Sequence, residues 1–475
     1  MGDEKFSGFS CSLHPPHHGY NDEAPPTSWV LLDRHTYIAD RENATSACGT
    51  MSNGKVIRVT LCTAPPPLVS YICVWCPDLP PTVFVGEPTV EADLVLFRLF
   101  RRGPRRHADY FVYKATGSKG PSLQLLQDPS PCLPVRNCFS LLPRVHVGGR
   151  GNDLSSLADG DDHYYIAVLS YRGNGPGELK LHVFDSMDKS WRTIIVDLEE
   201  DFYCHITSKV TALGEGGLLA FVDAWRGIVV CDVLGRRPPR YLPLPANLIV
   251  KDMIGGEPLL SRDIAFVDGR LVALGVWRIL SDEGSIPGYS SWTASSWSRP
   301  VTDSWDEDWQ EDYTIQSPDI AVHDAENTHL LPKLEDSEGT PQPTLRKLYM
   351  AHPTLSLIDK HIFYIMGKVN PKDEKALVLS IDMRSPKLQG VVVFDAERML
   401  GPIFGYAYMQ SWVSKYLSMA PGAPGIRRNP KRPESFHMLY PRKLKDRITV
   451  IPEKELQDTG TTKEAEDEDD VMVLG

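Results

Sequence analysis

The residues that could bind a metal or carry redox chemistry are gathered at two places in the sequence. Cys73 and Cys76 have the CxxC spacing that supplies two of the four ligands of a structural zinc site. The chain has no second CxxC, and the apolar run around this pair is typical of a buried strand, in which side chains three positions apart point to opposite faces. The second group, Cys11, His14, His17 and His18, lies in a proline-rich tail with no core around it. We therefore expect structural thiols, no bound metal and no other cofactor.

Residues that could catalyse a reaction do not form a recognisable motif. The sequence lacks the GxSxG nucleophile elbow, the GxxxxGK[ST] phosphate loop, the GxGxxG dinucleotide turn and the HExxH zinc motif. The acids Asp306, Glu307 and Asp308 are more typical of a solvated loop than of an acid-base pair. Catalytic residues can also lie on separate loops. A hydrolase with dispersed carboxylates or histidines is therefore the alternative to a protein without enzymatic activity.

Tryptophan and arginine give the most distinctive pattern. Four tryptophans lie in the polar stretch from Trp292 to Trp309, and another stands beside an arginine in a predicted turn between two apolar runs. Trp and Arg are enriched at the hot spots of protein interfaces. The candidate partner surface consists of Trp225, Arg226, Trp292, Trp297 and Arg299. The alternative is that these rings fill the spaces between packed sheets.

The elements that must position these side chains are short strands. Between Trp29 and Leu417 the apolar runs are four to eight residues long, rich in Val, Ile, Tyr, Phe and Leu, and interrupted by Gly, Pro, Asp and Asn. Helical periodicity is scarce. The composition of 42% hydrophobic and 24% charged residues is that of a globular chain, which excludes a disordered or membrane-embedded body.

A recurring pattern of two apolar residues followed by Asp indicates a repeat. It occurs at Asp33, Asp223, Asp268 and Asp359, with spacings of 190, 45 and 91 residues, close to multiples of 45 to 50. A strand-only repeat of this length matches one four-stranded blade of a β-propeller. We expect an all-β propeller of six to eight blades with the four aspartates at equivalent turns, and a type I′ turn at Asp268-Gly269. Paired β-sandwiches are the alternative.

The distribution of charge divides the chain into a body and two tails. We expect a disordered tail over residues 1–27, a propeller-like body over 28–417 with an acidic loop or degenerate blade at about 300–345, and a tail over 418–475. The last tail is basic and then acidic. The net charge of −12 sits mostly in such polar stretches, so it does not itself predict an anionic partner.

The sequence also bounds the location of the protein. The first twenty residues lack the apolar region of a signal peptide, and no apolar run is long enough to span a bilayer. The nine cysteines have no framework spacing, which fits a reducing compartment. We expect a soluble cytoplasmic protein with no membrane partner. The basic block at 427–447 resembles a nuclear-import patch, the alternative being a solvated linker. Because few aromatic residues are interleaved with these bases, a nucleic-acid partner is not expected.

Several phrases of the sequence together resemble a plant protein family. They are Ser28 to Asp33, Ala39 to Thr45, Ser70 to Pro77, Asp223 to Leu234, Arg240 to Pro245, Arg262 to Ala265 and Trp292 to Arg299. In this order they are similar to the plant proteins grouped as domain of unknown function 1618, over roughly residues 28 to 420. The resemblance implies no established activity, cofactor or substrate. The sequence therefore favours an uncharacterised plant protein, a non-enzymatic module that binds another protein of unknown identity.

Overall fold

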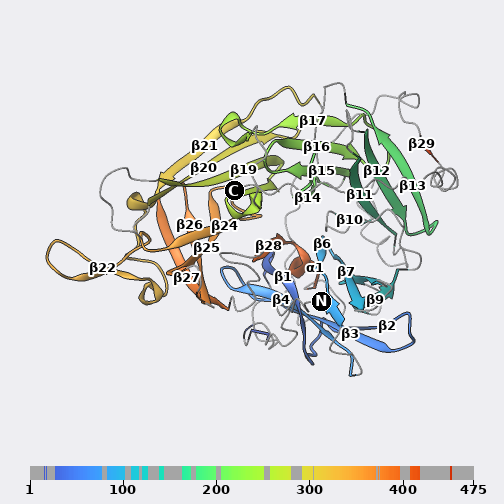
Figure 1. Ribbon diagram of the computed structural model, residues 1–475, viewed down its shortest axis with the longest axis horizontal. Coiled ribbons are helices and arrows are strands. Elements are labelled where there is room, and N and C mark those ends of the chain that lie inside the picture. The colour runs from blue at the N-terminus through green and yellow to red at the C-terminus, as the bar shows by residue number, and fades with distance from the viewer. Residues whose placement is uncertain are drawn as a thin grey trace, which may run out of the picture.

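The computed structural model describes the body of the chain with several gaps (Figure 1). The described residues are 15–16, 18, 27–77, 83–101, 108–116, 120–126, 139–143, 163–172, 178–198, 205–214, 216–250, 257–279, 291–302, 304–370, 373, 375–395, 407–417 and 450–451. Nearly all of the two expected tails, 1–27 and 418–475, lies outside these residues. The expected import patch at 427–447 lies outside them as well.

Six small sheets surround a common centre like the blades of a six-bladed β-propeller (Figure 1). Blade 1 contains β1 (Val30–Ile38), β2 (Ala47–Thr50), β3 (Val56–Cys62), β4 (Val69–Trp75) and β28 (Tyr408–Ser411). Blade 2 contains β5 (Val83–Val85), β6 (Thr89–Glu91), β7 (Leu94–Arg101), β8 (Ala108–Lys114) and β9 (Ser122–Leu125). Blade 3 contains β10 (Phe139–Pro143), β11 (Tyr164–Arg172), β12 (Glu178–Asp185), β13 (Ser190–Val196) and β29 (Val450–Ile451).

The other three blades have four strands each. Blade 4 contains β14 (Lys209–Ala212), β15 (Leu218–Asp223), β16 (Gly227–Asp232) and β17 (Arg240–Pro243). Blade 5 contains β18 (Arg262–Val267), β19 (Arg270–Ile279), β20 (Ser291–Pro300) and β21 (Gln310–Gln316). Blade 6 contains β24 (Tyr349–Leu355), β25 (Ile362–Lys368), β26 (Lys375–Asp382) and β27 (Lys387–Asp395). The propeller prediction is confirmed with six blades, and the paired-sandwich alternative is wrong.

The ring closes by pairing the two ends of the body. β28 pairs antiparallel with β1, from Val30 opposite Ser411 to Asp33 opposite Tyr408. On its other side β1 pairs in parallel with β4, whereas consecutive strands in the other blades are antiparallel. Strands from near both ends of the body therefore share blade 1.

Among the described residues the hydrophobic core forms seven clusters, of which six each combine residues of two neighbouring blades and one lies within blade 1. Residues that share such a cluster across a boundary, from blades 1 and 2 round to blades 6 and 1, are Leu61 and Phe97, Leu96 and Val168, Leu181 and Phe221, Val230 and Leu271, Trp292 and Phe363, and Met366 and Leu31. Each blade therefore buries both faces. This is why strands such as β15 and β16 are continuous apolar runs, not alternating ones.

The repeated aspartates do not occupy equivalent turns, so that expectation is wrong. Asp268 and Gly269 form the predicted type I′ turn between β18 and β19, with φ of 47° and 75°. Asp359 lies in the corresponding turn of blade 6, but Asp223 ends the second strand of blade 4 and Asp33 lies inside β1. The pattern marks the end of a buried segment, where a carboxylate can accept backbone N–H groups, and such ends occur at more than one place in a blade.

The acidic segment at about 300–345 lies partly in blade 5 and partly outside the ring. β21 completes blade 5, and β22 (Lys333–Glu335) and β23 (Pro341–Pro343) form a separate two-stranded sheet that projects from the left of the ring (Figure 1). The helical elements described are short: η2 (Ala246–Leu248), η3 (Pro258–Leu260), η4 (Ser317–Asp319), η5 (Thr328–Leu330) and α1 (Val413–Leu417). In the part of the chain that the structure describes, no helix is long and apolar enough to cross a membrane.

Candidate functional site

Trp292 and Trp297 both lie on β20 and fill the spaces on either side of blade 5. Trp292, 1% exposed, packs in the core between blades 5 and 6, and Trp297, 5% exposed, packs in the core between blades 4 and 5. Five positions separate them, so their rings point to opposite faces of the strand. These two rings follow the alternative interpretation of the sequence, in which tryptophans fill the spaces between sheets.

Arg299, at 4% exposed, is buried as well and holds the acidic loop against blade 5. Its Nη2 donates a hydrogen bond to the carbonyl oxygen of Trp305 (3.0 Å), and its guanidinium lies 5.8 Å from the centre of the Trp309 ring. Burial lowers the pKa of Arg299, against the opposing charges of Asp308 and Glu307. Of the expected partner residues, only Trp225 and Arg226 keep a substantial exposed area.

Trp225 and Arg226 form the turn between β15 and β16, and the buried carboxylate of Asp223 organises that turn. The Asp223 oxygens accept hydrogen bonds from the backbone N–H of Trp225 (3.0 Å), the backbone N–H of Ile206 (3.0 Å) and Nη1 of Arg226 (3.1 Å). A carboxylate at 0% exposure needs such partners. Asp223 therefore fixes three residues of the surface in one arrangement.

A second arginine supports the Trp225 ring from blade 5. The guanidinium of Arg262 lies 4.4 Å from the ring centre of Trp225 and donates to the carbonyl oxygens of Ala224 (2.8 Å) and Leu248. Burial lowers the pKa of Arg262 to about 10, and the Asp223 charge opposes this shift. The Trp225 carbonyl oxygen accepts a hydrogen bond from the backbone N–H of Val250 (2.9 Å). This bond and the stacked guanidinium together hold the half-buried tryptophan in place.

A further tryptophan lies next to this turn. Trp309 Nε1 donates to the carbonyl oxygen of Pro243 (2.8 Å), and Pro243 pairs with Gly227, the residue after Arg226. We call Ile206, Trp225, Arg226 and Trp309 the Trp225 surface. Ile206 is 42% exposed, and the exposed acids at 306–308 immediately precede Trp309.

The centre of the ring holds a polar cluster that sequence reasoning missed. The strands β6, β10, β14, β18, β24 and β28 lie at blade edges, and from β6 to β28 each contacts the one that follows it in this order. Lys209 Nζ on β14 lies 2.6 Å from Asp263 Oδ1 on β18. Asp263 Oδ2 accepts from the backbone N–H of Leu355 (2.8 Å) and from Gln410 Nε2 (2.9 Å). One carboxylate thus joins blades 4, 5, 6 and 1.

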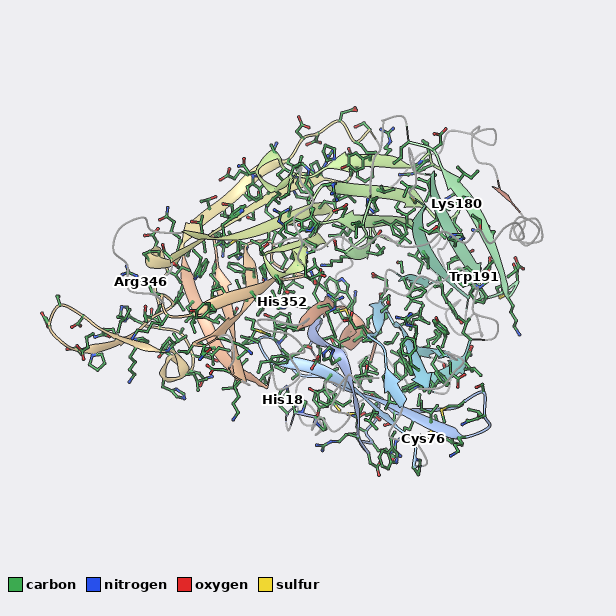
Figure 2. The ribbon with its side chains drawn as sticks, viewed as in Figure 1. His18, Cys76, Lys180, Trp191, Arg346 and His352 are labelled. Carbon is green, nitrogen blue, oxygen red and sulfur yellow. The ribbon has the colours of Figure 1, made fainter. Side chains whose placement is uncertain are left out.

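Two more titratable groups belong to this central cluster. Burial raises the pKa of Glu91 on β6 to about 7, although the backbone N–H groups of Ala212 and Ala92 and the Lys209 charge lower it. Tyr408 on β28 is 4% exposed, its hydroxyl has no partner among the described residues, and burial beside Asp263 raises its pKa. His352, on the neighbouring β24, also lies on the side of the centre (Figure 2).

The sequence offered no signal for this cluster. Each of its members lies beside or inside a short apolar run, and the members are up to 319 positions apart, from Glu91 to Gln410. Only ring closure brings them together.

The CxxC cysteines lie on different faces of blade 1, as strand alternation predicts. Cys73 packs with Tyr37, Cys62 and Tyr71, whereas Cys76 belongs to the core between blades 1 and 2. Figure 2 labels Cys76 of the CxxC pair and His18 of the N-terminal group of cysteine and histidines. Across the residues that the structure describes, no three His, Cys, Asp or Glu side chains are grouped so that they could hold a metal ion.

Comparison with known proteins agrees with the resemblance seen in the sequence. Residues 221–364, from β15 to β25, match the family described as protein of unknown function, DUF1618. This match contains the Trp225 turn, β18 with Asp263, and the three buried residues of β20. No curated protein matches the chain.

Proposed function

We propose that this chain is a non-enzymatic protein-interaction module that binds its partner through the Trp225 surface. The observation that carries the proposal is that the half-buried Trp225 ring is held in place by the Arg262 guanidinium stacked on it, in a surface that also exposes Ile206. A tryptophan already fixed in position loses little conformational entropy on binding, which favours affinity. Trp and Arg at the centre of a patch are typical of interface hot spots.

The charges around the Trp225 surface favour a partner with basic side chains. Asp306, Glu307 and Asp308 are exposed next to Trp309, whereas the charge of Arg226 is already paired with Asp223. The exposed charge immediately before Trp309 is therefore negative. A Lys- or Arg-rich segment would pair with these acids and could also stack on Trp309.

The experiment is affinity capture with a matched substitution. We compare proteins retained by the wild-type chain, by Trp225→Ala and by Trp191→Ala. Trp191 is the control because it is also a half-buried tryptophan but lies on β13 of blade 3, outside the Trp225 surface (Figure 2). We expect Trp225→Ala to lose a partner that the other two retain, with affinity for the purified partner reduced at least tenfold. A partner lost equally from both variants, or from neither, would contradict the proposal.

We further propose an intracellular plant protein, located in the cytoplasm, with import into the nucleus as the alternative. The support is the resemblance to the plant family and the free thiols at Cys48, Cys62, Cys73, Cys76 and Cys231, which fit a reducing compartment. Imaging a tagged chain with and without the basic block at 427–447 distinguishes the two locations.

A hydrolase is the second candidate, and one observation favours it. A carboxyl with a pKa of about 7, such as Glu91, is suited to act as a general base near neutral pH. Against it, both oxygens of Asp263 and the Lys209 ammonium are engaged in joining blades. Turnover of chromogenic ester, phosphate or glycoside substrates that disappears in Glu91→Gln would establish this candidate in place of the first.

A further inference from the structure

Two buried thiols lie in contact on adjacent strands of blade 1. Cys62 ends β3 and Cys73 is in β4, where Cys62 pairs with Tyr71 and Cys73 pairs with Thr60. The two cysteines are therefore diagonal neighbours on one face of an antiparallel pair, and their thiols are linked by a hydrogen bond. Both are free thiols, at 0% and 1% exposure.

The surroundings make the two thiols chemically different. The hydrogen bond from the Cys73 thiol lowers the pKa of Cys62, against the effect of burial, and the Arg41 charge acts in the same direction. The same bond, together with burial, raises the pKa of Cys73. Cys62 therefore has the greater thiolate character, which is the property that makes a cysteine the nucleophile that attacks an oxidant.

A short segment near the N-terminus contacts β4 next to this pair. The hydroxyl of Tyr71 donates to the carbonyl oxygen of Pro16 (2.9 Å), and His18 Nε2 is 2.8 Å from the carbonyl oxygen of Val69. The His18 ring also packs edge-on to Tyr71, with centroids 6.1 Å apart. These three contacts join the segment to β4. They hold the segment against Tyr71, which packs in one cluster with both cysteines.

We propose that Cys62 and Cys73 form a peroxide-sensitive modification site, in which Cys62 is oxidised first and Cys73 completes a disulfide. In the first step the Cys62 thiolate attacks hydrogen peroxide, the O–O bond breaks, and Cys62 sulfenic acid and hydroxide form. In the second step the Cys73 thiol loses its proton and its sulfur attacks the sulfenic sulfur of Cys62. The S–S bond forms, the S–O bond breaks, and the hydroxide that leaves is protonated to water. Each peroxide molecule accepts the two electrons that the two thiols lose.

The register of the strands gives the disulfide a structural consequence. A disulfide requires Cα atoms within about 7 Å, whereas diagonal cross-strand neighbours are about 7 to 8 Å apart. The bond therefore forms with a small shift of β3 against β4. Because β4 pairs with β1, and β1 with β28, this shift reaches the strands that close the ring.

The test is oxidation of the reduced full-length chain with hydrogen peroxide, followed by alkylation under denaturing conditions and peptide mass spectrometry. We expect a peptide pair linked through Cys62 and Cys73, lighter than the two reduced peptides by two hydrogen atoms, and a melting temperature several degrees below that of the reduced protein. The exposed thiol of Cys48 serves as the internal measure of oxidant dose.

Three single substitutions separate the steps. In Cys73→Ser, Cys62 should remain as the sulfenic acid and be trapped by dimedone, whereas in Cys62→Ser neither trapping nor crosslinking should occur at Cys73. Cys231→Ser is the matched control, because Cys231 is buried between blades 3 and 4 and burial raises its pKa to about 12. It should leave the crosslink unchanged. If wild-type Cys62 and Cys73 are both recovered as alkylated thiols at a dose that oxidises Cys48 completely, the proposal is wrong.

Discussion

Lys209 of blade 4 and Asp263 of blade 5 form an ion pair with 2.6 Å between Nζ and Oδ1, on strands that face the centre of the ring. The second oxygen of Asp263 binds the backbone of blade 6 and the Gln410 side chain of blade 1. Gln410 lies on β28, the strand that closes the ring against β1. This carboxylate therefore acts where closure occurs, between segments far apart in sequence. Its role in the structure is to join blades.

Removing this carboxylate should destabilise the fold. In Asp263→Ala, the Lys209 ammonium, the Leu355 N–H and the Gln410 amide lose their shared acceptor. Breaking a buried pair costs about 3 to 5 kcal/mol, and since Lys209 keeps 17% side-chain exposure we expect roughly 2 to 4 kcal/mol in the free energy of unfolding. Urea denaturation measures the loss. Asp324→Ala is the control, since its pair with Lys387 is exposed and 3.5 Å long, and it should cost less than about 1 kcal/mol.

Replacing a core tryptophan should lower the free energy of unfolding more than replacing the half-buried Trp225. Trp292→Ala removes a ring that is fully buried between blades 5 and 6 and should lower the free energy of unfolding by about 3 to 5 kcal/mol. Trp225→Ala removes a half-buried ring that contacts a guanidinium and should cost about 1 kcal/mol. Both values come from denaturant titrations of the purified variants. Equal losses would mean that Trp225 is a core residue and not part of a partner surface.

The fold class followed from the sequence because each blade obeys local rules. Apolar runs bounded by turn residues predicted the strands, and in the structure such runs pair as the hairpins β8–β9 and β11–β12. The repeat was assigned to the wrong aspartates, however. The equivalent ones are Asp185, Asp232 and Asp382, each at the end of the third strand of its blade. Each accepts the backbone N–H two residues later, at 3.0, 2.9 and 2.8 Å. Two of them are 47 residues apart, but an extra segment before blade 6 obscures the period.

The candidate site was predictable only in part. A position that depends on neighbouring residues in the sequence could be predicted, whereas one that depends on other blades could not. Trp225-Arg226 could be predicted because a turn between two apolar runs places both residues at the surface. Burial of Trp292, Trp297 and Arg299 depends on the neighbouring blades and on the acidic loop, which no pattern within β20 records. The same holds for Asp263, whose partners come from three other blades.

The turn at Asp268-Gly269 should be sensitive to a single methyl group. Gly269 has φ of 75°, a conformation that costs an L-residue about 1 to 2 kcal/mol, so Gly269→Ala should lower the free energy of unfolding by that amount. Gly216→Ala is the matched control, because a Cβ there meets nothing within 4 Å and its φ is not positive. We expect the control to lie within about 0.5 kcal/mol of wild type. A Gly269→Ala protein as stable as this control would contradict the assigned turn.

Glu91 should make the stability of the propeller depend on pH in a direction unusual for an acid. Burial raises its pKa from 4.5 to about 7, so between these values the folded chain holds a proton that the unfolded chain has released. The Glu91 contribution to stability therefore falls as pH rises through this window, and the full destabilisation is present above pH 7. At about 1.36 kcal/mol per unit of pKa, reduced because the side chain is partly exposed, we expect roughly 1 to 2 kcal/mol.

The measurement is the difference in unfolding free energy between Glu91→Gln and wild type at several pH values. His205 must be separated from Glu91, because burial lowers its pKa to about 4 and its contribution to stability rises with pH from 4 to 6.5, the opposite direction. This contribution cancels in the difference, since both proteins keep His205. The variant should therefore gain stability over wild type as pH increases from 5 to 8, and His205→Gln should leave that gain in place. A difference that is constant with pH would show that Glu91 is solvated as in the unfolded chain and is not a member of the central cluster.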